Sequence, residues 1–348
     1  MAFLGPLALI LISLVTRAIF DKLLALSPDM ALVAHWAQAQ SLFDLTAAVA
    51  LAGVGAGLTV FAARREHDEV RLMRDALVWG LMIAGVAAVA LAMLAPLLNA
   101  LLGREIAPTG VTGALAIAGG LMFTAPGMFS ALWQGRLERS KMIATNLIGW
   151  APLALAASGL FGPVDMRLLL AARFVTLTAL TIWLCAPLVR NVLAKGGALP
   201  SWRESALKRY IPAGLSIGIL SPFSVMWSRA ELAHGLSWDE AAQLQALWRA
   251  SEWVTGLAGG LIPLVFLPRM AAAVGRTAFL HELRRTWRTL WIPGALSIAL
   301  LWAGQGVVMP LLYSEKFLMP ALASGLFLLG DALRLACWVP LHGLFATE

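Results

Sequence analysis

Long apolar runs recur along almost the whole sequence. Ten of them are each about twenty residues long, the length that a helix needs to cross a bilayer. The connectors between them are short, and the runs show no alternation of polar and apolar residues that would indicate strands. Backbone polar groups cannot stay unpaired in hydrocarbon, so we expect each run to be an α-helix. The expected spans are residues 3–25, 38–63, 76–98, 110–133, 143–161, 168–188, 210–228, 241–266, 289–312 and 319–342.

Charged residues are scarce in this chain. The 26 Lys and Arg and 19 Asp and Glu make up 13% of 348 residues, against about a quarter in a soluble domain. This composition excludes a soluble enzyme, a nucleic-acid-binding protein and a disordered scaffold. The first run lacks a basic leader and a cleavage site, so we expect it to be retained as a span. The sequence therefore predicts an all-α, multi-pass membrane protein.

The basic residues are distributed unevenly between the connectors. The even-numbered connectors hold 17 of them, and the odd-numbered connectors hold 4, of which Arg229 is one. Because cytoplasmic loops of membrane proteins are rich in Lys and Arg, this bias predicts that the even connectors and both termini are cytoplasmic. The same bias explains the net charge of +7 as a topology signal, so no nucleic-acid partner is expected.

A connector at residues 191–209, rich in basic residues and containing a Gly-Gly pair, divides the chain into two parts. We expect a six-helix bundle at residues 1–190 and a four-helix bundle at residues 210–348. A weak repeat supports this division, because Leu-Ser-Pro-Asp at residues 26–29 resembles Leu-Ser-Trp-Asp at residues 236–239. Each tetrapeptide leads into a span with two glycines four residues apart, at 53 and 57 and at 256 and 260, which favour close helix packing. Two repeats with a site between them are typical of transporters.

Ionisable residues inside membrane spans are costly and often mark a functional cavity. Two interpretations of the set in this chain stay open. In the structural one, Arg17 pairs with Asp21, Arg249 with Glu252 and Asp331 with Arg334 along single helices, while Lys22 and Arg173 extend to the interface. In the functional one, the groups line a polar cavity between the two halves. The set is Arg17, Asp21, Lys22, Asp44, Arg173, Arg249, Glu252, Asp331 and Arg334.

In the functional interpretation, guanidinium groups from the two halves bind a pyrophosphate, because their planar fork matches phosphate oxygens. Arg17 in the first half and Arg249 in the second are the principal candidates, and Lys22, Arg173 and Arg334 add positive charge. Trp248 and Trp253 flank Arg249 and Glu252 and are candidates for stacking on sugar rings. The carboxylates of Asp44, Glu252 and Asp331 are candidates for ion coupling, and Asp44 has no basic partner at i+3 or i+4.

Several short motifs point to one family. They are Ser237-Trp238-Asp239-Glu240, the acid Glu252, Leu267-Pro268-Arg269, Tyr313-Ser314-Glu315-Lys316-Phe317 and Gly330-Asp331-Ala332-Leu333-Arg334, with Lys22-Leu23-Leu24-Ala25 and Gly53-Val54-Gly55-Ala56-Gly57 in the first half. Together they resemble Wzx-type lipid-linked oligosaccharide flippases of the multidrug/oligosaccharidyl-lipid/polysaccharide exporter superfamily. Glu252 matches a position that is commonly acidic, and Asp331 with Arg334 matches an acid followed by a base.

This resemblance implies two bundles around a cationic cavity and a location in the bacterial inner membrane. It implies movement of undecaprenyl-pyrophosphate-linked oligosaccharide, as in O-antigen and lipopolysaccharide synthesis, by alternating access. A proton or sodium gradient would supply the energy, as in an antiporter, without a cofactor. Membrane lipids, a polysaccharide polymerase and glycosyltransferases are the implied partners. The family usually has twelve spans, so we expect the second half to lack the counterparts of spans five and six.

Three other classes stay open. A multidrug or metabolite exporter of the same superfamily is the nearest alternative, although many such exporters act on cations. A membrane-embedded glycosyltransferase or polymerase generally needs larger outward loops than this chain has, so we do not expect an enzyme. A scaffold without transport activity is the third.

Overall fold

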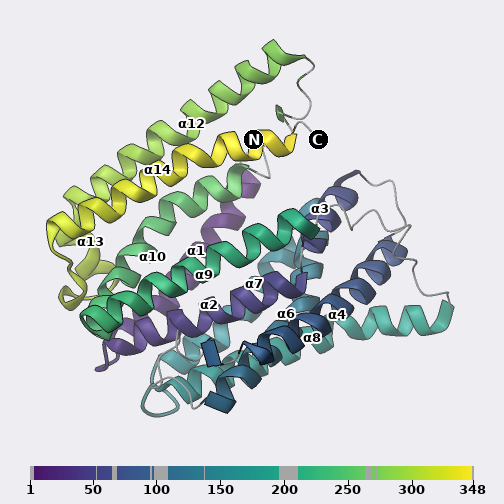
Figure 1. Cartoon of the computed structure of the whole chain (residues 1–348), viewed down its shortest axis with the longest axis horizontal. Coiled ribbons are helices and arrows are strands. Elements are labelled where there is room, and N and C mark those ends of the chain that lie inside the picture. The colour runs from purple at the N-terminus through teal and green to yellow at the C-terminus, as the bar shows by residue number, and fades with distance from the viewer. Residues whose placement is uncertain are drawn as a thin grey trace. The chain divides into compact units, whose positions relative to one another are not determined.

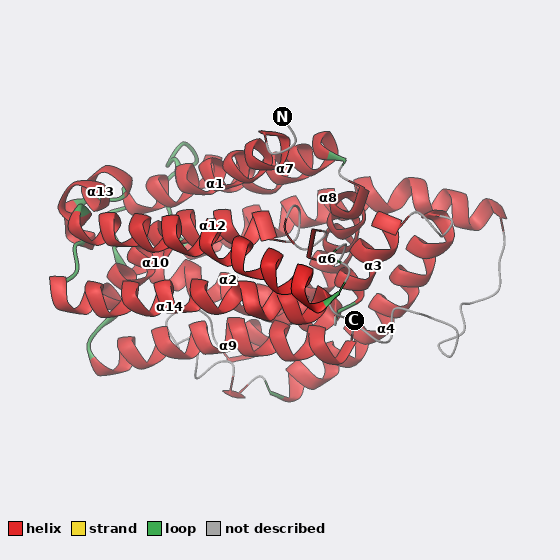
Figure 2. Cartoon of the chain, turned by 90° about the horizontal axis from the view of Figure 1, so that it is seen from above, coloured by secondary structure: helices red, strands yellow, loops and turns green. Residues whose placement is uncertain are grey.

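The computed structural model describes residues 4–51, 53–64, 69–94, 96–97, 109–136, 138–195, 211–262, 266, 269–270, 273 and 275–346. Within these ranges the regular elements are helices and no strand is present, which confirms the predicted all-α class (Figure 1, Figure 2). The helices are α1 (Leu4–Ala25), α2 (Ala31–Leu51), α3 (Val54–Arg64), α4 (Glu69–Met93), α6 (Thr109–Arg136), α7 (Arg139–Ala157), α8 (Met166–Lys195), α9 (Ile211–Gly235), α10 (Trp238–Leu261), α12 (Arg276–Ala303), α13 (Gln305–Leu312), the short 3-10 helix η3 (Glu315–Phe317) and α14 (Ala321–Ala346).

Two of the predicted spans are not single helices. The run at residues 38–63 is divided between α2 and α3 at Gly53, whose φ of 76° lies in the left-handed region that glycine adopts most readily. The run at residues 289–312 is divided at Gly304, where α12 and α13 meet at a bend of 86°. Gly53 therefore marks a helix break rather than the uninterrupted helix-packing surface that the sequence predicts.

Three described helical segments are long and apolar enough to cross a membrane, and they lie at Met73–Met93, Met166–Pro187 and Ala321–Leu341. The bent pair α12–α13 becomes a fourth if it counts as one broken span. The count of ten spans and the cytoplasmic position of both termini stay predictions.

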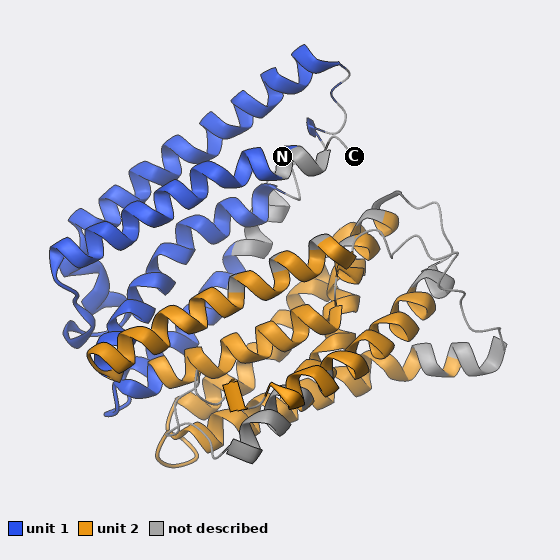
Figure 3. Cartoon of the chain, viewed as in Figure 1, with its two compact units in different colours: residues 1–33, 239–348 blue, residues 34–238 orange. Residues whose placement is uncertain are grey.

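The chain packs as two compact units (Figure 3). Unit 1 consists of Met1–Val33 and Asp239–Glu348, and unit 2 consists of Ala34–Trp238. Unit 1 thus combines the first helix with the last part of the sequence. Most of the predicted linker at residues 191–209 lies outside the described residues, so the predicted division into six and four helices stays a prediction.

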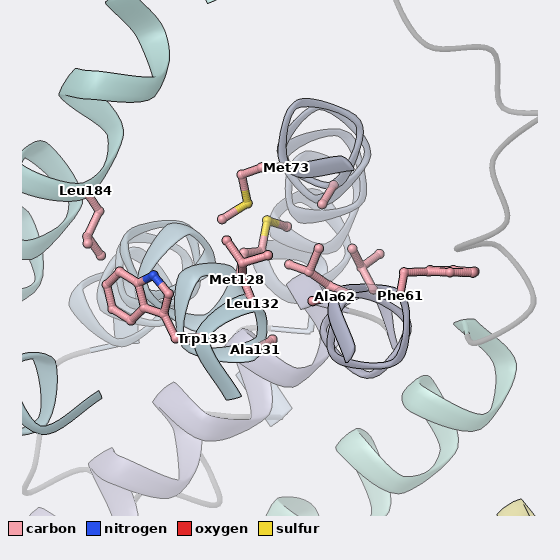
Figure 4. Packing of buried hydrophobic residues seen from close by; sticks show 11 residues of the cluster. Phe61, Ala62, Met73, Met128, Ala131, Leu132, Trp133 and Leu184 are labelled. Carbon is pink, nitrogen blue, oxygen red and sulfur yellow. The ribbon is translucent and has the colours of Figure 1, made fainter. Parts of the chain in front are cut away.

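The core of unit 2 forms around α6, which packs against α3, α4, α7 and α8. Met73 of α4 and Met128 and Leu132 of α6 are almost fully buried, and Figure 4 shows their side chains converging between the helices. Pro126 lies inside α6 and has no N–H to donate to the Met122 carbonyl four residues earlier. The hydroxyl of Thr181 in α8 donates to that carbonyl at 2.9 Å, so a neighbouring helix replaces the missing donor.

In unit 1, α12 packs along α14 over a core of apolar side chains that includes Leu290, Leu335 and Val339. Two indole rings on successive turns of α12, Trp287 and Trp291, stack with centroids 4.8 Å apart. Their N–H groups donate to carbonyls of α14, so the two helices are joined by polar as well as apolar contacts. Helices α1 and α10 of the same unit also carry charged residues, among them Arg17 and Asp21 on α1 and Arg249 and Glu252 on α10.

Candidate functional site

Two charged residues from α1 and two from α10 form a network in unit 1. Arg17 and Asp21 are one turn apart on α1, and Arg249 and Glu252 are nearly one turn apart on α10, so each pair shares a face of its helix. Arg249 Nη1 donates to Glu252 Oε2 at 2.6 Å, and Arg17 Nη1 lies 3.5 Å from the same oxygen. Arg249 Nε also lies 3.9 Å from Asp21 Oδ2. Two guanidinium groups therefore converge on one carboxylate oxygen.

The pairing is only partly the one that the sequence predicts. The pairs within single helices, Arg249 with Glu252 and Asp331 with Arg334, are confirmed at 2.6 and 2.9 Å. Arg17 lies near Asp21, but it also forms an ion pair across helices with Glu252. Arg17 and Arg249 do not approach a site from the two halves expected from the sequence, because both belong to unit 1 and share one carboxylate.

A second pair of charges lies where α10 meets α14. Asp331 has a side chain only 6% exposed, and its Oδ1 forms an ion pair with Arg334 Nη2 at 2.9 Å. The Ser251 hydroxyl of α10 donates to the other carboxylate oxygen, Oδ2. Both oxygens of this buried carboxylate are therefore bonded, as a buried charge requires.

The tryptophans predicted to stack on sugars differ in their surroundings. The Arg334 guanidinium lies over the rings of Trp248 and Trp338, 5.9 and 5.5 Å from their centroids. The Phe327 ring is also close to Trp248, with centroids 5.4 Å apart. Trp248 therefore already packs against a cation and an aromatic ring, whereas Trp253 is half-buried on α10. The proposed stacking on sugar rings stays a prediction for both.

Lys22 does not extend to the interface as one of the sequence interpretations expects. Its ammonium group donates to the carbonyls of Pro310, Leu311 and Tyr313 at 3.4, 3.0 and 2.6 Å. These carbonyls lie at the end of α13, where the last turn of a helix has no backbone donors of its own. Lys22 thus caps α13 and joins it to α1. A cation at a helix C-terminus also complements the helix dipole.

Tyr313 follows α13 directly and is almost fully buried. Burial raises the pKa of its phenol well above the usual range, and the nearby carboxylates of Asp21 and Glu252 raise that pKa further. The phenol therefore stays neutral and retains its proton as a hydrogen-bond donor beside the network of α1 and α10.

The other predicted site residues lie in unit 2. Arg173 is buried rather than extended to the interface, and its guanidinium lies over Phe123 and Trp150. Asp44 is exposed on α2, and its carboxylate accepts a hydrogen bond of 2.8 Å from Gln40, one turn earlier. Neither residue is part of the network in unit 1.

Arg229 corrects one assignment made from the sequence, which placed it in an outward connector. Helix α9 continues to Gly235, and the Arg229 side chain is buried, with Nη2 donating to the Ser41 hydroxyl of α2 at 2.7 Å. The sequence also did not single out Ser251 or assign a role to Tyr313. Their positions beside charged groups depend on helices that are far apart along the chain, so no local spacing indicates them.

The network and the pair at α14 balance in charge. Three arginines, at 17, 249 and 334, are matched by three carboxylates, at 21, 252 and 331. An arrangement of this kind can hold an anion only if a carboxylate moves away or takes up a proton, because like charges repel strongly in an apolar surrounding. Among the residues that the structure describes, no group of three or more His, Cys, Asp or Glu side chains is arranged to hold a metal ion.

Comparison of the chain with known protein families, with characterised proteins and with solved structures finds no match.

Proposed function

We propose that this protein is a multi-pass inner-membrane flippase that moves a polyprenyl-diphosphate-linked oligosaccharide between leaflets by ion-coupled alternating access. The observation that carries the proposal is the convergence of Arg17 and Arg249 on one carboxylate oxygen. Two guanidinium groups held this close provide paired donors for the oxygens of a diphosphate. The helices able to span a membrane and the resemblance of the sequence motifs support the same proposal.

The site is supported by what an intramembrane charge costs. Charged side chains inside a bilayer are expensive and are retained mainly where they face a cavity or a partner. A purely structural role needs only pairs that satisfy each other within one helix, such as Asp331 with Arg334. The network of α1 and α10 instead shares one carboxylate between two arginines on two helices, so a ligand with more acceptor oxygens can engage both arginines at once.

In this proposal, the carboxylates of the site couple transport to a gradient. Glu252 lies between the two arginines, and Asp331 is buried with its charge held by Arg334 and Ser251. A proton or a sodium ion that binds to either carboxylate changes the charge facing the ligand, and this is the requirement for coupling. Asp44 is a less direct candidate, because it is exposed on α2 and bonded to Gln40.

The experiment is a translocation assay with the full chain in cells that make the lipid-linked oligosaccharide. We expect Arg17→Ala and Arg249→Ala each to lower the amount that reaches the outer leaflet by at least about tenfold, since each removes a charge-assisted contact with phosphate. Arg190→Ala, which removes an exposed arginine from α8, is the matched control and should leave transport unchanged. Normal translocation in both site variants would refute the diphosphate site.

A second measurement separates the coupling ion from the substrate. We expect transport to depend on only one of the two gradients: it should stop when the coupling ion's gradient is collapsed and continue when the other ion's gradient is collapsed. Transport that is indifferent to both gradients would contradict the coupling part of the proposal. Export of amphipathic drugs with no effect on lipid-linked sugars would instead favour the exporter of the same superfamily.

A further inference from the structure

The geometry around Glu252 points to a second role for this residue. We propose that its carboxylate is an internal anion that occupies the two-arginine site and is displaced when a diphosphate binds. The inference rests on the proposed function, since it concerns how the same site receives its ligand. It assigns Glu252 as a competitor of the ligand, a role different from that of an ion-coupling residue alone.

The first argument is the unequal sharing of one oxygen. Glu252 Oε2 accepts a short hydrogen bond from Arg249 at 2.6 Å, whereas Arg17 Nη1 remains 3.5 Å away. A carboxylate forms its strongest contacts with guanidinium groups through two parallel bonds, and this one does so with neither arginine. A diphosphate has more acceptor oxygens spread over two phosphorus centres, so it can bond both guanidinium groups where Glu252 bonds one.

The second argument is the direction from which the site is open. The side chains of Arg17 and Glu252 are each 30% exposed, whereas those of Arg249 and Asp21 are only 12% and 14% exposed. A ligand therefore reaches the network at Arg17 and Glu252 first. Asp21 lies 3.9 Å from Arg249 Nε and is able to keep that guanidinium in place when Glu252 moves away.

The third argument concerns charge. Glu252 is faced by Arg17 and Asp21 from α1, by Arg249 on its own helix, by Tyr313 after α13 and by Asp331 from α14. A diphosphate that enters beside an ionised Glu252 adds negative charge to a set that is already balanced. Binding is therefore favoured when the Glu252 carboxylate moves away from the arginines as the diphosphate arrives, so that one anion replaces another.

The test uses the purified full chain in detergent and inorganic pyrophosphate as the probe, with affinity measured by calorimetry. We expect Glu252→Gln to bind pyrophosphate at least about tenfold more tightly, because the neutral amide no longer competes for the arginines. Asp239→Asn is the matched control, since it removes the same charge from the same helix about 20 Å away and should not change the affinity. Adding Arg17→Ala to Glu252→Gln should abolish the gain.

A second variant covers the case in which Glu252→Gln does not fold. Glu252→Asp keeps the charge but shortens the side chain by one methylene, which draws the carboxylate back from the two arginines. We expect Glu252→Asp to bind pyrophosphate at least about threefold more tightly than the wild-type chain, because its carboxylate competes less well for the guanidinium groups. An unchanged affinity in Glu252→Asp would overturn the internal-anion role.

The outcomes separate this inference from the proposed function. Binding that is lost in Arg17→Ala but not improved in Glu252→Gln overturns the internal-anion role and leaves the diphosphate site standing. Pyrophosphate binding that is unchanged in Arg17→Ala and in Arg249→Ala overturns the site itself, and the internal-anion role falls with it.

Discussion

We expect Trp287→Phe to destabilise the protein through a carbonyl group on the neighbouring helix α14. Pro340 has no backbone N–H, so the Ala336 carbonyl four residues earlier lacks its usual helical donor. The Trp287 indole N–H donates to this carbonyl at 2.8 Å. Phenylalanine keeps an aromatic ring at that position but removes the donor, which leaves the carbonyl unpaired in a partly buried, apolar surrounding.

The magnitude follows from comparison with Trp291, which stacks on Trp287 and donates to the Ala332 carbonyl at 3.1 Å. That carbonyl already accepts the backbone N–H of Ala336 as part of the helix, so the second bond is redundant. Trp291→Phe should therefore cost only the change in ring stacking, about 0.5–1.5 kcal/mol. Trp287→Phe should cost that amount plus the penalty of an unpaired carbonyl, about 1–3 kcal/mol.

The assay is reversible unfolding in mixed micelles, followed by circular dichroism because the substitutions alter tryptophan fluorescence. Each tryptophan variant is measured alone and together with Pro340→Ala, which restores an N–H to residue 340. We expect Pro340→Ala to remove the extra cost of Trp287→Phe and to leave the cost of Trp291→Phe unchanged. Equal costs for the two tryptophan variants, or no coupling to Pro340, would refute the reasoning.

Three further predictions follow, two measured by the unfolding free energy and the one for Lys22→Met by hydrogen exchange. Thr181→Val removes the hydroxyl that donates to the Met122 carbonyl, which Pro126 leaves without its helical donor. This substitution should lower the free energy of unfolding by about 1–3 kcal/mol. A change near zero would show that the carbonyl has another partner. Lys22→Met keeps the apolar stem but uncaps the end of α13, so hydrogen exchange there should rise, whereas unchanged protection would contradict the capping role. Gly135→Ala places a methyl group against the backbone of α3 and should cost about 1–3 kcal/mol. Gly149→Ala meets open space and should stabilise α7 by about 0.5–1 kcal/mol, so an equal loss in both would contradict the packing argument.

The existence of the helices could be predicted because their apolar runs are long, whereas their breaks could not. Gly53 and Gly304 both interrupt predicted spans. Gly57 and Gly256 also lie in apolar runs, yet α3 and α10 continue through them. Glycine in a membrane helix serves close packing as readily as it serves a turn. Which of the two occurs depends on the helices that pack nearby, and the local sequence does not contain that information.

The members of the charged network could be predicted individually, because each interrupts an apolar run. Their partners could not, since periodicity indicates only pairs on one helix. The ion pair of Arg17 with Glu252 and the hydrogen bond of Ser251 to Asp331 join helices that are far apart in the sequence. Such contacts depend on which helix faces meet, and apolar burial over many residues contributes more to that choice than single charge pairs do.

Burial also distinguishes arginines that are able to meet a ligand from arginines that complete the packing. Arg173 and Arg229 are only 6% and 2% exposed, so a ligand would have to separate α-helices to reach either guanidinium. Arg17 retains 30% exposure beside Glu252. An arginine inside an apolar run is therefore a functional candidate only when part of its guanidinium stays accessible. By that criterion the candidates in unit 1 are Arg17, at the contact of α1 with α10, and Arg334 of α14, whose side chain is 35% exposed. The site at Arg17 requires the first helix and the second half of the chain together.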